Sequence, residues 1–247
     1  MRTRWRRLLT WVSAGLVALA LSVVTLKALA PEAWGTLMHK LRGEQTEAGA
    51  AGELAPKVGP GLVALFAEKG CKYPPERLTF VALKAEKRLE VWAPGPDGQA
   101  RLVQEYPVLA ASGRAGPKLR EGDRQVPEGV YRVVGLNPQS QFHLSIKLDY
   151  PNEFDREMAR REGRDRLGGD IFIHGDAVSI GCLAMGDPAI EELFLLVSET
   201  GQARVRVIIA PSDFRRAGAR PAPPPGAPEW AGTLYEQIGR ELAGYRK

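Results

Sequence analysis

Metal-binding and disulfide-forming residues are scarce in this sequence of 247 residues, which holds two cysteines and three histidines. None of them shows the His-x-x-His or Cys-x-x-Cys spacing of a zinc site, so His174, Asp176 and Cys182 do not predict one. We therefore expect no metal and no cofactor. A packed thiol is the preferred interpretation of Cys71, and a resting disulfide between Cys71 and Cys182 in an oxidising compartment is the alternative.

An excess of basic charge is also missing from most of the chain. The formal net charge is +5, and residues 1–30 hold five basic and no acidic side chains, so the remainder sums to zero. Polyanion binding requires a basic stripe that neutralises phosphates. Nucleic acid is therefore not an expected partner.

The one long uncharged apolar run lies near the N-terminus. Leu8–Leu26 comprises nineteen residues, which rise about 28 Å as a helix and suffice to span a membrane. Four arginines precede the run and only Lys27 closely follows it, which predicts a cytoplasmic N-terminus. We expect residues 1–30 to be an inner-membrane signal anchor, with the rest of the chain in the periplasm. Cleavage after Ala30, giving a secreted protein, is the alternative, although Pro31 is a poor context for it.

The remaining chain divides by composition. Residues 31–60, rich in Ala, Gly, Glu and Gln, predict a linker. Residues 61–211 predict one mostly-β domain with short peripheral helices. Residues 212–247 predict a Pro-rich spacer and a terminal helix that docks on the domain through its apolar positions, which are Trp230, Leu234, Ile238 and Leu242.

The expected elements of the domain follow from apolar patterning and turn residues. Strands are expected at 78–83, 88–92, 101–108, 130–134, 142–148, 171–173 and 204–209. Helices are expected at 153–162, capped by Asn152, and from Asp187 to about 201. A brief helix is also expected from Leu62 to Ala67, ending before Gly70. Residues 113–129 are dense in Gly, Pro and charge and predict a long loop, a feature that is usually functional or disordered.

Residues that carry chemistry concentrate between Ile171 and Met185. A short strand delivers His174, Gly175 can turn the backbone sharply, and Cys182 follows His174 by eight positions. A thiol needs a neighbouring base to become a thiolate nucleophile, and this turn could bring the two together. Considered from composition alone, a packed cysteine and a structural histidine remain the alternative.

Three further residues of the stretch have expected roles. Gly181 leaves room beside the sulfur, so the backbone N–H groups of Gly181 and Cys182 are candidate donors to an oxyanion. Ser179 is expected to bond local backbone and shape the turn.

The run His174-Gly-x-x-x-Ser-Ile-Gly-Cys182 resembles the signature of the L,D-transpeptidase catalytic domain (YkuD-like) family, especially its YafK-like branch. The likeness covers roughly residues 78 to 211. It extends upstream through the blocks Ser112–Lys118, Gly122–Tyr131, Asn137–Pro138, Phe142–Ser145 and Asp149–Asn152.

The resemblance implies a β-rich sandwich in which Cys182 is the nucleophile and His174 the base. The substrate it implies is a peptidoglycan stem peptide, cut after meso-diaminopimelate through a Cys acyl-enzyme. It also places the 113–129 loop beside the active site and makes His143 a secondary candidate for a site role. A backbone carbonyl, Asp176 or a more distant carboxylate is expected to orient His174.

Two departures from the better-known branch concern substrate positioning. Ile180 stands where that branch has a second histidine, and Leu183-Ala184-Met185 replace a segment that contains an arginine. The basic residues that could substitute for this arginine are Lys118, Arg120, Arg124 and Arg156.

Three functions fit the resemblance. The first is an L,D-transpeptidase that crosslinks peptidoglycan or attaches a protein to it. The second is a thiol hydrolase or amidase that releases peptide or a wall-linked lipoprotein, an activity that the YafK-like branch includes. The third is a non-catalytic wall-binding module, which the paired His174 and Cys182 disfavour.

Overall fold

The computed structural model describes residues 45–179, 181–216 and 222–246. The predicted anchor at Leu8–Leu26 lies outside these residues. Among the helices that are described, none is long and apolar enough to cross a membrane. From Thr46 onwards the chain forms one compact unit.

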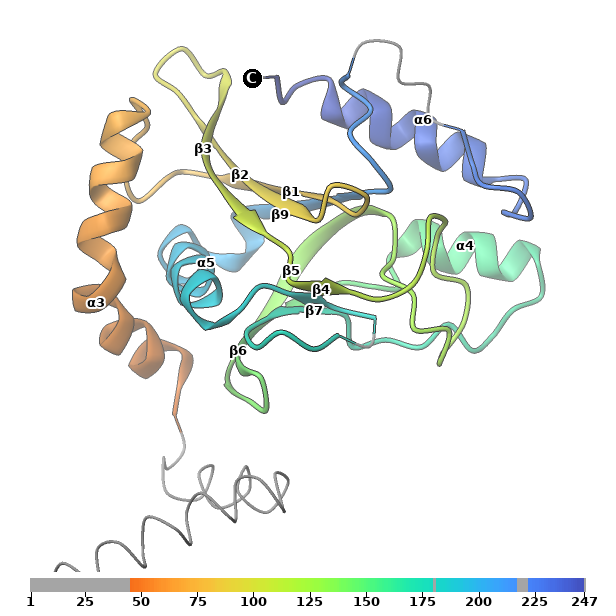
Figure 1. The fold of residues 1–247 in the computed structure, drawn as a ribbon, viewed down its shortest axis with the longest axis horizontal. Coiled ribbons are helices and arrows are strands. Elements are labelled where there is room, and N and C mark those ends of the chain that lie inside the picture. Colours follow the sequence, from red (N-terminus) through yellow and green to blue (C-terminus); the bar gives the residue numbers. More distant parts are fainter. Residues whose placement is uncertain (1–44, 180, 217–221, 247) are drawn as a thin grey trace, which may run out of the picture. The chain divides into compact units, whose positions relative to one another are not determined.

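A mixed nine-stranded sheet organises this unit, in the order β3-β2-β1-β9-β5-β6-β7-β8-β4 (Figure 1). The strands are β1 (Leu78–Leu83), β2 (Arg88–Pro94), β3 (Ala100–Pro107), β4 (Ala110–Ala111), β5 (Gly129–Ser140), β6 (His143–Leu148), β7 (Phe172–His174), β8 (Leu183–Ala184) and β9 (Val205–Ala210). The helices of the described chain are α3 (Glu47–Glu68), α4 (Glu153–Arg161), α5 (Asp187–Thr200), the 3₁₀ turn η1 (Gln202–Arg204) and α6 (Ala231–Leu242). The expectation of a sheet-rich domain with helices around it is therefore correct.

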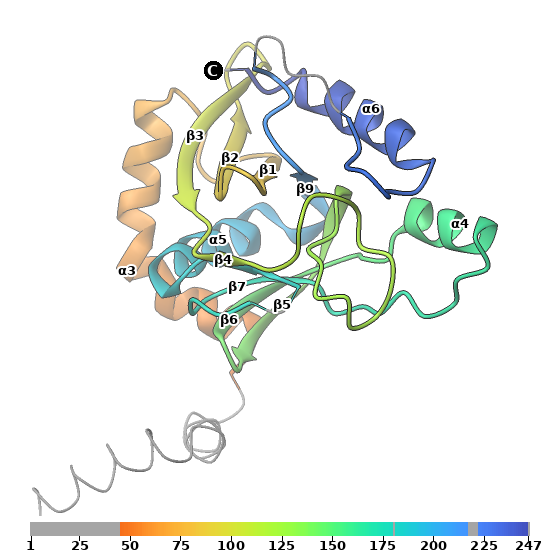
Figure 2. The same cartoon turned by 45° about the vertical axis from the view of Figure 1, so that its right-hand side comes forward.

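The central strands are buried on both faces, which explains their nearly continuous apolar sequence. All six residues of β1 are buried. Since side chains alternate along a strand, Phe80 and Ala82 join the core under α3 and α5, whereas Val81 and Leu83 join the core under α6. Figures 1 and 2 show these helices on opposite sides of the sheet.

The C-terminal segment is fixed to the sheet by α6 and by a buried ion pair. Leu234, Ile238 and Leu242 of α6 are each at most 3% exposed. Arg215 donates to both carboxylate oxygens of the fully buried Glu90 at 2.8 and 2.9 Å, and to the Tyr245 carbonyl at 2.8 Å. Charge-assisted bonds of this kind satisfy a buried carboxylate that would otherwise be costly.

The linker expected at 31–60 is corrected for its described second half, because residues 47–60 begin α3. This helix has 22 residues and contains the brief helix that was expected at Leu62–Ala67, so the expected helix was too short. The Thr46 side chain accepts from the Gly49 backbone N–H at 3.1 Å and caps it. The buried face of α3 outweighs the cost of Pro56 and Pro60 inside the helix.

The long strand β5 connects the part of the sheet that supports the domain to the part that carries the motif. Its residues 129–132 pair with β9, and the rest pair with β6 past an irregularity between Val133 and Gly135. Beyond β6 come β7 and β8, which pair in parallel and hold the two ends of the motif side by side.

Candidate active site

His174 lies at the end of β7, where its backbone is held on both sides. The Met185 N–H donates to the His174 carbonyl at 2.8 Å, and the Gly175 N–H donates to the Leu144 carbonyl at 3.1 Å. The ring atom Nδ1 lies 2.6 Å from the Gly175 carbonyl oxygen. Because a carbonyl only accepts, Nδ1 carries a proton, and in the neutral ring Nε2 keeps its lone pair.

This contact identifies the group that orients the imidazole as the Gly175 carbonyl. Asp176 is exposed, and its Oδ1 accepts from the Ala177 N–H at 2.5 Å rather than from the ring. Burial lowers the pKa of His174, although the bond to Gly175 and the charge of Asp176 oppose the shift. The side chain, 2% exposed, is therefore neutral at pH 7 and able to accept a proton.

The sharp turn after His174 is made by Asp176, whose φ is 60°, and not by Gly175 as expected. Gly175 is required for another reason. A Cβ at this position would lie 2.6 Å from the Phe142 carbonyl oxygen and 2.7 Å from Asp187 Oδ1. The chain therefore needs a glycine here for close packing.

Cys182 directly precedes β8 and presents a partly exposed free thiol. Its Sγ lies 3.8 Å from the Asp170 carbonyl oxygen. Burial raises the pKa of the thiol, and the Phe172 N–H and Lys118 oppose the shift. Cys71 is a second free thiol and is buried, so the alternative of a disulfide between them is not formed.

The strand register brings Cys182 close to the end of β7 that carries His174. Ile173 pairs with Leu183 and His174 with Ala184, and Cys182, in the bend before β8, lies two positions before the partner of His174. No hydrogen bond of the described residues joins the ring to the sulfur. The resting site therefore holds a thiol and a neutral imidazole rather than a preformed ion pair.

The backbone donors expected to receive an oxyanion are both occupied. The Gly181 N–H donates to Ser112 Oγ at 2.6 Å, and the Cys182 N–H donates to Ser179 Oγ at 3.1 Å. The Ser179 hydroxyl itself donates to the Cys182 carbonyl at 2.5 Å and so closes the turn. Both N–H groups would have to leave these oxygens before they could bind a developing negative charge.

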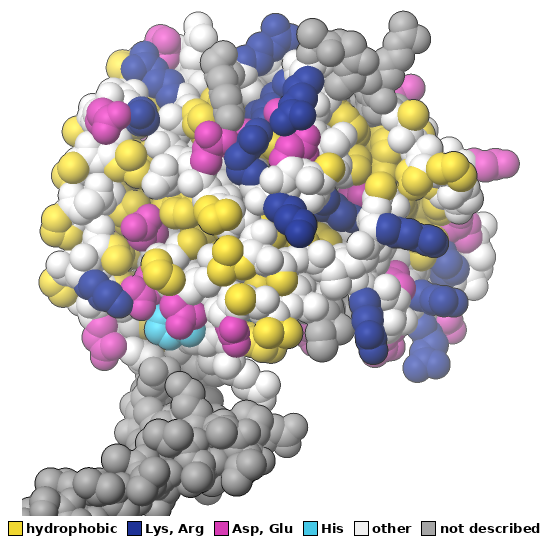
Figure 3. All heavy atoms as spheres, viewed as in Figure 1, with side chains coloured by type: hydrophobic (Ala, Val, Ile, Leu, Met, Phe, Trp, Pro, Cys, Tyr) yellow, Lys and Arg dark blue, Asp and Glu magenta, His cyan; other side chains and the backbone are white. Residues whose placement is uncertain are grey.

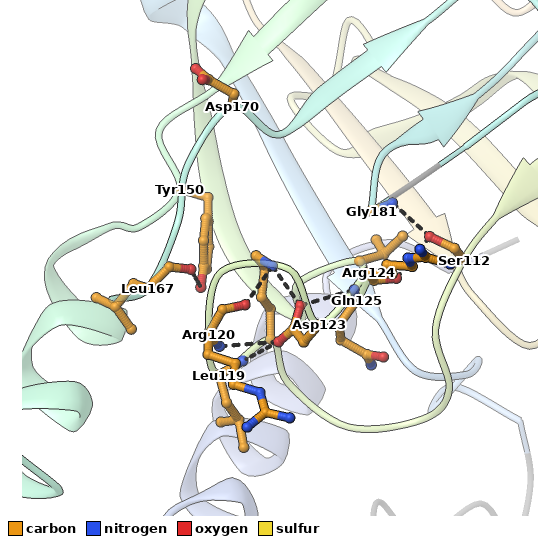
Figure 4. A network of polar contacts seen from close by, with 12 residues as sticks. Ser112, Leu119, Arg120, Asp123, Arg124, Gln125, Tyr150, Leu167, Asp170 and Gly181 are labelled. Carbon is orange, nitrogen blue, oxygen red and sulfur yellow. Dashed lines mark hydrogen bonds and ion pairs between the residues drawn. The ribbon is translucent and has the colours of Figure 1, made fainter. Parts of the chain in front are cut away.

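The 113–129 loop lies against Gly181, the residue before Cys182, and is densely hydrogen-bonded (Figure 4). Lys118 is 7% exposed, and its Nζ donates to Asp123 Oδ1 at 2.5 Å and to the Arg120 carbonyl at 2.9 Å. Burial alone would raise the pKa of Asp123, but Lys118 and three backbone N–H groups hold it below its usual value. Lys118 therefore braces the loop, and two of its three donors are unavailable to a substrate carboxylate.

The other basic candidates lie at different distances from the motif. Arg124 and Arg120 are exposed on the loop, and the backbone of Arg124 lies against Gly181. Figure 3 shows Lys and Arg side chains projecting separately over this region of the surface. Arg156 lines a cavity of about 790 Å³ with Arg132 and Arg206, and no described residue of the motif lines it.

His143 is half-buried at the start of β6 and faces α5. Its Nε2 lies 2.9 Å from Glu191 Oε1, and Glu191 Oε2 accepts from Lys57 at 2.6 Å. The pairing gives His143 a structural partner rather than an open position for substrate.

Sequence reasoning assigned no role to Ser112 or Asp170, although both contact the motif. Ser112 begins the upstream block that resembles the family, which is the signal that could have singled it out. Asp170 offers no such signal, since it acts through its backbone carbonyl. Among the described residues no group of three His, Cys, Asp or Glu side chains is placed to hold a metal ion.

Comparison with known proteins gives a family for this fold and site. The model of the L,D-transpeptidase catalytic domain (YkuD) matches residues 78–209. YafK of Escherichia coli strain K12, whose own assignment as an L,D-transpeptidase is provisional, is 37% identical over 141 residues, 55% of this chain and 54% of that protein. YafK of the O157:H7 strain matches equally. The chain thus spans about half the length of the curated relatives it matches.

Two solved structures show weaker likeness. The helical cell shape determining protein Pgp2 from Campylobacter jejuni is 21% identical, with 74% of this chain and 63% of that chain covered and a TM-score of 0.46. Bd1075 of Bdellovibrio bacteriovorus is 19% identical, with 68% and 56% covered and a TM-score of 0.41.

The family match runs from β1 into β9 and contains both His174 and Cys182. It covers more than half of the chain. The protein therefore belongs to the YkuD family of L,D-transpeptidase catalytic domains, a family of cell-wall enzymes that act on peptidoglycan stem peptides.

Proposed function

We propose that the protein is an L,D-transpeptidase that acts on peptidoglycan stem peptides through an acyl-enzyme on Cys182. One observation carries the proposal beyond family membership. The Gly175 carbonyl fixes the proton of His174 on Nδ1, which leaves Nε2 as the base for Cys182, two positions before the strand partner of His174.

The proposed reaction has two halves. Nε2 of His174 removes the proton of the Cys182 thiol as the sulfur attacks the carbonyl of diaminopimelate. The tetrahedral intermediate collapses to a thioester, and the imidazolium gives its proton to the departing amine. An acceptor amine then attacks the thioester, Nε2 takes the amine proton, and the thiolate leaves and is reprotonated.

Substrate binding has two tasks in this scheme. It brings the sulfur, which now faces the Asp170 carbonyl, within reach of Nε2. It also draws the Gly181 and Cys182 N–H groups away from the serine oxygens that hold them, so that they stabilise the oxyanion. Proton transfer during attack suits a neutral pair, since charging either group before attack is disfavoured by burial.

Hydrolysis is the alternative, and a specific observation favours it. The sulfur is partly exposed, so water reaches the position where a thioester would form. Lys118, which could have held an acceptor carboxylate, is engaged with Asp123. In this case the product would be a shortened peptide or a protein released from the wall.

The test is incubation of the full-length protein with tetrapeptide muropeptides and with peptide-linked wall protein, followed by mass spectrometry. New diaminopimelate–diaminopimelate crosslinks that vanish in Cys182→Ala and persist in Cys71→Ala support transfer. Release of free protein or shortened peptide without crosslinks establishes the hydrolase instead. The absence of any product with either substrate overturns both proposals.

We further infer that residues 1–30 anchor the protein in the inner membrane with the catalytic domain in the periplasm. The support is the uncharged run Leu8–Leu26 behind four arginines. Cell fractionation and N-terminal sequencing test this: an intact N-terminus in the membrane fraction is expected. A soluble periplasmic protein that begins at Pro31 would show cleavage.

A further inference from the structure

The ring of Phe142 covers the imidazole of His174. The two ring centroids lie 4.6 Å apart with an interplanar angle of 34°. Phe142 is 39% exposed, whereas His174 beneath it is 2% exposed. The large apolar side chain of Phe142 thus remains partly exposed on the surface and shields the proposed base from solvent.

The position of Phe142 is set by the turn between β5 and β6. Its N–H donates to Ser140 Oγ at 3.1 Å, and its carbonyl accepts from the Leu144 N–H at 3.0 Å. The same carbonyl packs against Gly175, where even a Cβ would come within 2.6 Å. The backbone of Phe142 is therefore in contact with the residue whose carbonyl orients His174.

The next residue, His143, holds this turn in an unusual conformation. Its φ is 70°, a left-handed value that costs a non-glycine residue about 1 kcal/mol. The bond from His143 Nε2 to Glu191 offsets this cost, and Lys57 of α3 pairs with the other oxygen of Glu191. Figure 3 shows a histidine at the surface among acidic side chains.

We propose that Phe142 and His143 are positioning residues for the base. The His143–Glu191 bond holds the Phe142 ring over the His174 imidazole. The inference rests on the proposed role of His174 in catalysis. It gives His143 a function that does not involve contact with substrate.

The physical effect of the cover is on the charge of His174. An apolar ring that excludes water disfavours the imidazolium and keeps the lone pair of Nε2 available. The charged groups around this cluster are Asp176 of the turn, Asp187 and Glu191 of α5, and Lys57 of α3.

Histidine titration by NMR tests the proposal without relying on activity. The full-length protein has three histidines, so the signals are assigned with His→Gln variants. Phe142→Ala exposes the ring, and the pKa of His174 should rise by roughly half a unit or more. Phe142→Leu keeps an apolar cover and should give a smaller rise. Val63→Ala, which truncates an exposed apolar residue on α3, is the matched control.

Variants of His143 test whether its bond to Glu191 holds the Phe142 ring in place. His143→Gly permits the positive φ without strain but removes the bond to Glu191, and it should raise the pKa of His174 as Phe142→Ala does. His143→Gln keeps a donor for Glu191 and should restore the wild-type titration. If stem-peptide turnover is detected, the acid limb of kcat/KM should move to higher pH in step with the NMR value.

An unchanged His174 titration in both Phe142→Ala and His143→Gly overturns the inference, whatever the activity. A shift of the His174 pKa in Phe142→Ala without one in His143→Gly would show that the His143–Glu191 bond does not hold the ring in place. If turnover is absent in every variant while the pKa shifts occur, the positioning is upheld and the proposed function fails on its own.

Discussion

The hydroxyl oxygen of Ser112 lies 2.6 Å from the backbone nitrogen of Gly181, although 69 positions separate the two residues. The same hydroxyl donates to the Arg124 carbonyl at 2.7 Å. Ser112 thus joins the beginning of the 113–129 loop, its far side and the residue before Cys182 in one hydrogen-bonded unit (Figure 4). Movement of the loop and release of the Gly181 N–H are therefore linked.

Replacing Ser112 by alanine should affect both stability and turnover. The buried Gly181 N–H would lose its acceptor, which costs about 1–3 kcal/mol of unfolding free energy. Ser112→Thr keeps the hydroxyl and should recover most of the loss. Urea unfolding measures the first effect, and the initial rate of stem-peptide cleavage measures the second.

Ser198→Ala on α5 serves as the control, because it removes the same hydroxyl from a half-buried position outside the motif. An unfolding free energy that is the same for Ser112→Ala as for Ser198→Ala would contradict the assigned bond.

Alkylation of Cys182 should be slow at neutral pH. Burial raises the pKa of its thiol, and iodoacetamide reacts with the thiolate only. In a Cys71→Ala background the rate should keep rising above pH 8.5, the usual value of a cysteine thiol being about 8.5. A plateau below that pH would show a preformed thiolate–imidazolium pair.

Replacing Lys118 should change the alkylation rate of Cys182 in a predictable direction. Its charge is the cationic influence that lowers the pKa of the Cys182 thiol, so Lys118→Met should slow alkylation further at a given pH. Asp123→Asn disturbs the same loop contact but keeps the ammonium, and it should not slow the reaction.

Several features of the fold and site were predictable because they depend on local sequence. Apolar segments bounded by turn residues predicted seven of the nine strands of the sheet. The two strands that were not predicted, β4 and β8, have two residues each. The family-like motif located His174 and Cys182. The first part of α3 was missed, because its glycines and prolines are typical of linkers, whereas burial against the domain determines its conformation.

The contacts within the site depend instead on which strands become neighbours. Ser112 meets Gly181 because β4 pairs with β8, and Phe142 meets His174 because β6 pairs with β7. The periodicity of apolar residues along the sequence does not indicate which strands will pair. Lys118 was expected to bind substrate because its charge is visible in the sequence, whereas the Asp123 carboxylate that engages it is apparent only in the folded loop.

Gly175→Ala should be far more damaging than an ordinary glycine replacement. The new Cβ would meet the Phe142 carbonyl oxygen and Asp187 Oδ1 at 2.6 and 2.7 Å, and overpacking of this kind costs about 1–3 kcal/mol. Turnover should also fall, since the carbonyl that orients His174 belongs to the displaced residue. Gly52→Ala in α3 is the control, because its Cβ meets nothing within 4 Å and alanine favours a helix. Equal unfolding free energies for the two variants in urea would refute the close packing at Gly175.

The stability of the domain should carry a pH dependence that comes from Asp155. This carboxylate accepts from the Asn152 N–H at 3.0 Å in the capping box of α4, and it is 7% exposed. Burial raises its pKa to about 6, although the bonds from Asn152 and Tyr131 oppose the shift. The folded state therefore holds the proton up to about pH 6, whereas the unfolded chain releases it near pH 4.

The sign of the effect follows from this difference in proton binding. Between pH 4 and 6 the folded state binds more protons than the unfolded state, so the unfolding free energy falls as the pH rises. Asp155→Asn keeps the acceptor for Asn152 and resembles the protonated acid, but it cannot ionise. The stability of the wild type relative to Asp155→Asn should thus drop by about 1–3 kcal/mol from pH 4 to pH 7. Urea unfolding at pH 4, 5, 6 and 7, followed by tryptophan fluorescence, measures the difference. A difference that stays constant across this range would mean that Asp155 ionises normally in the folded protein.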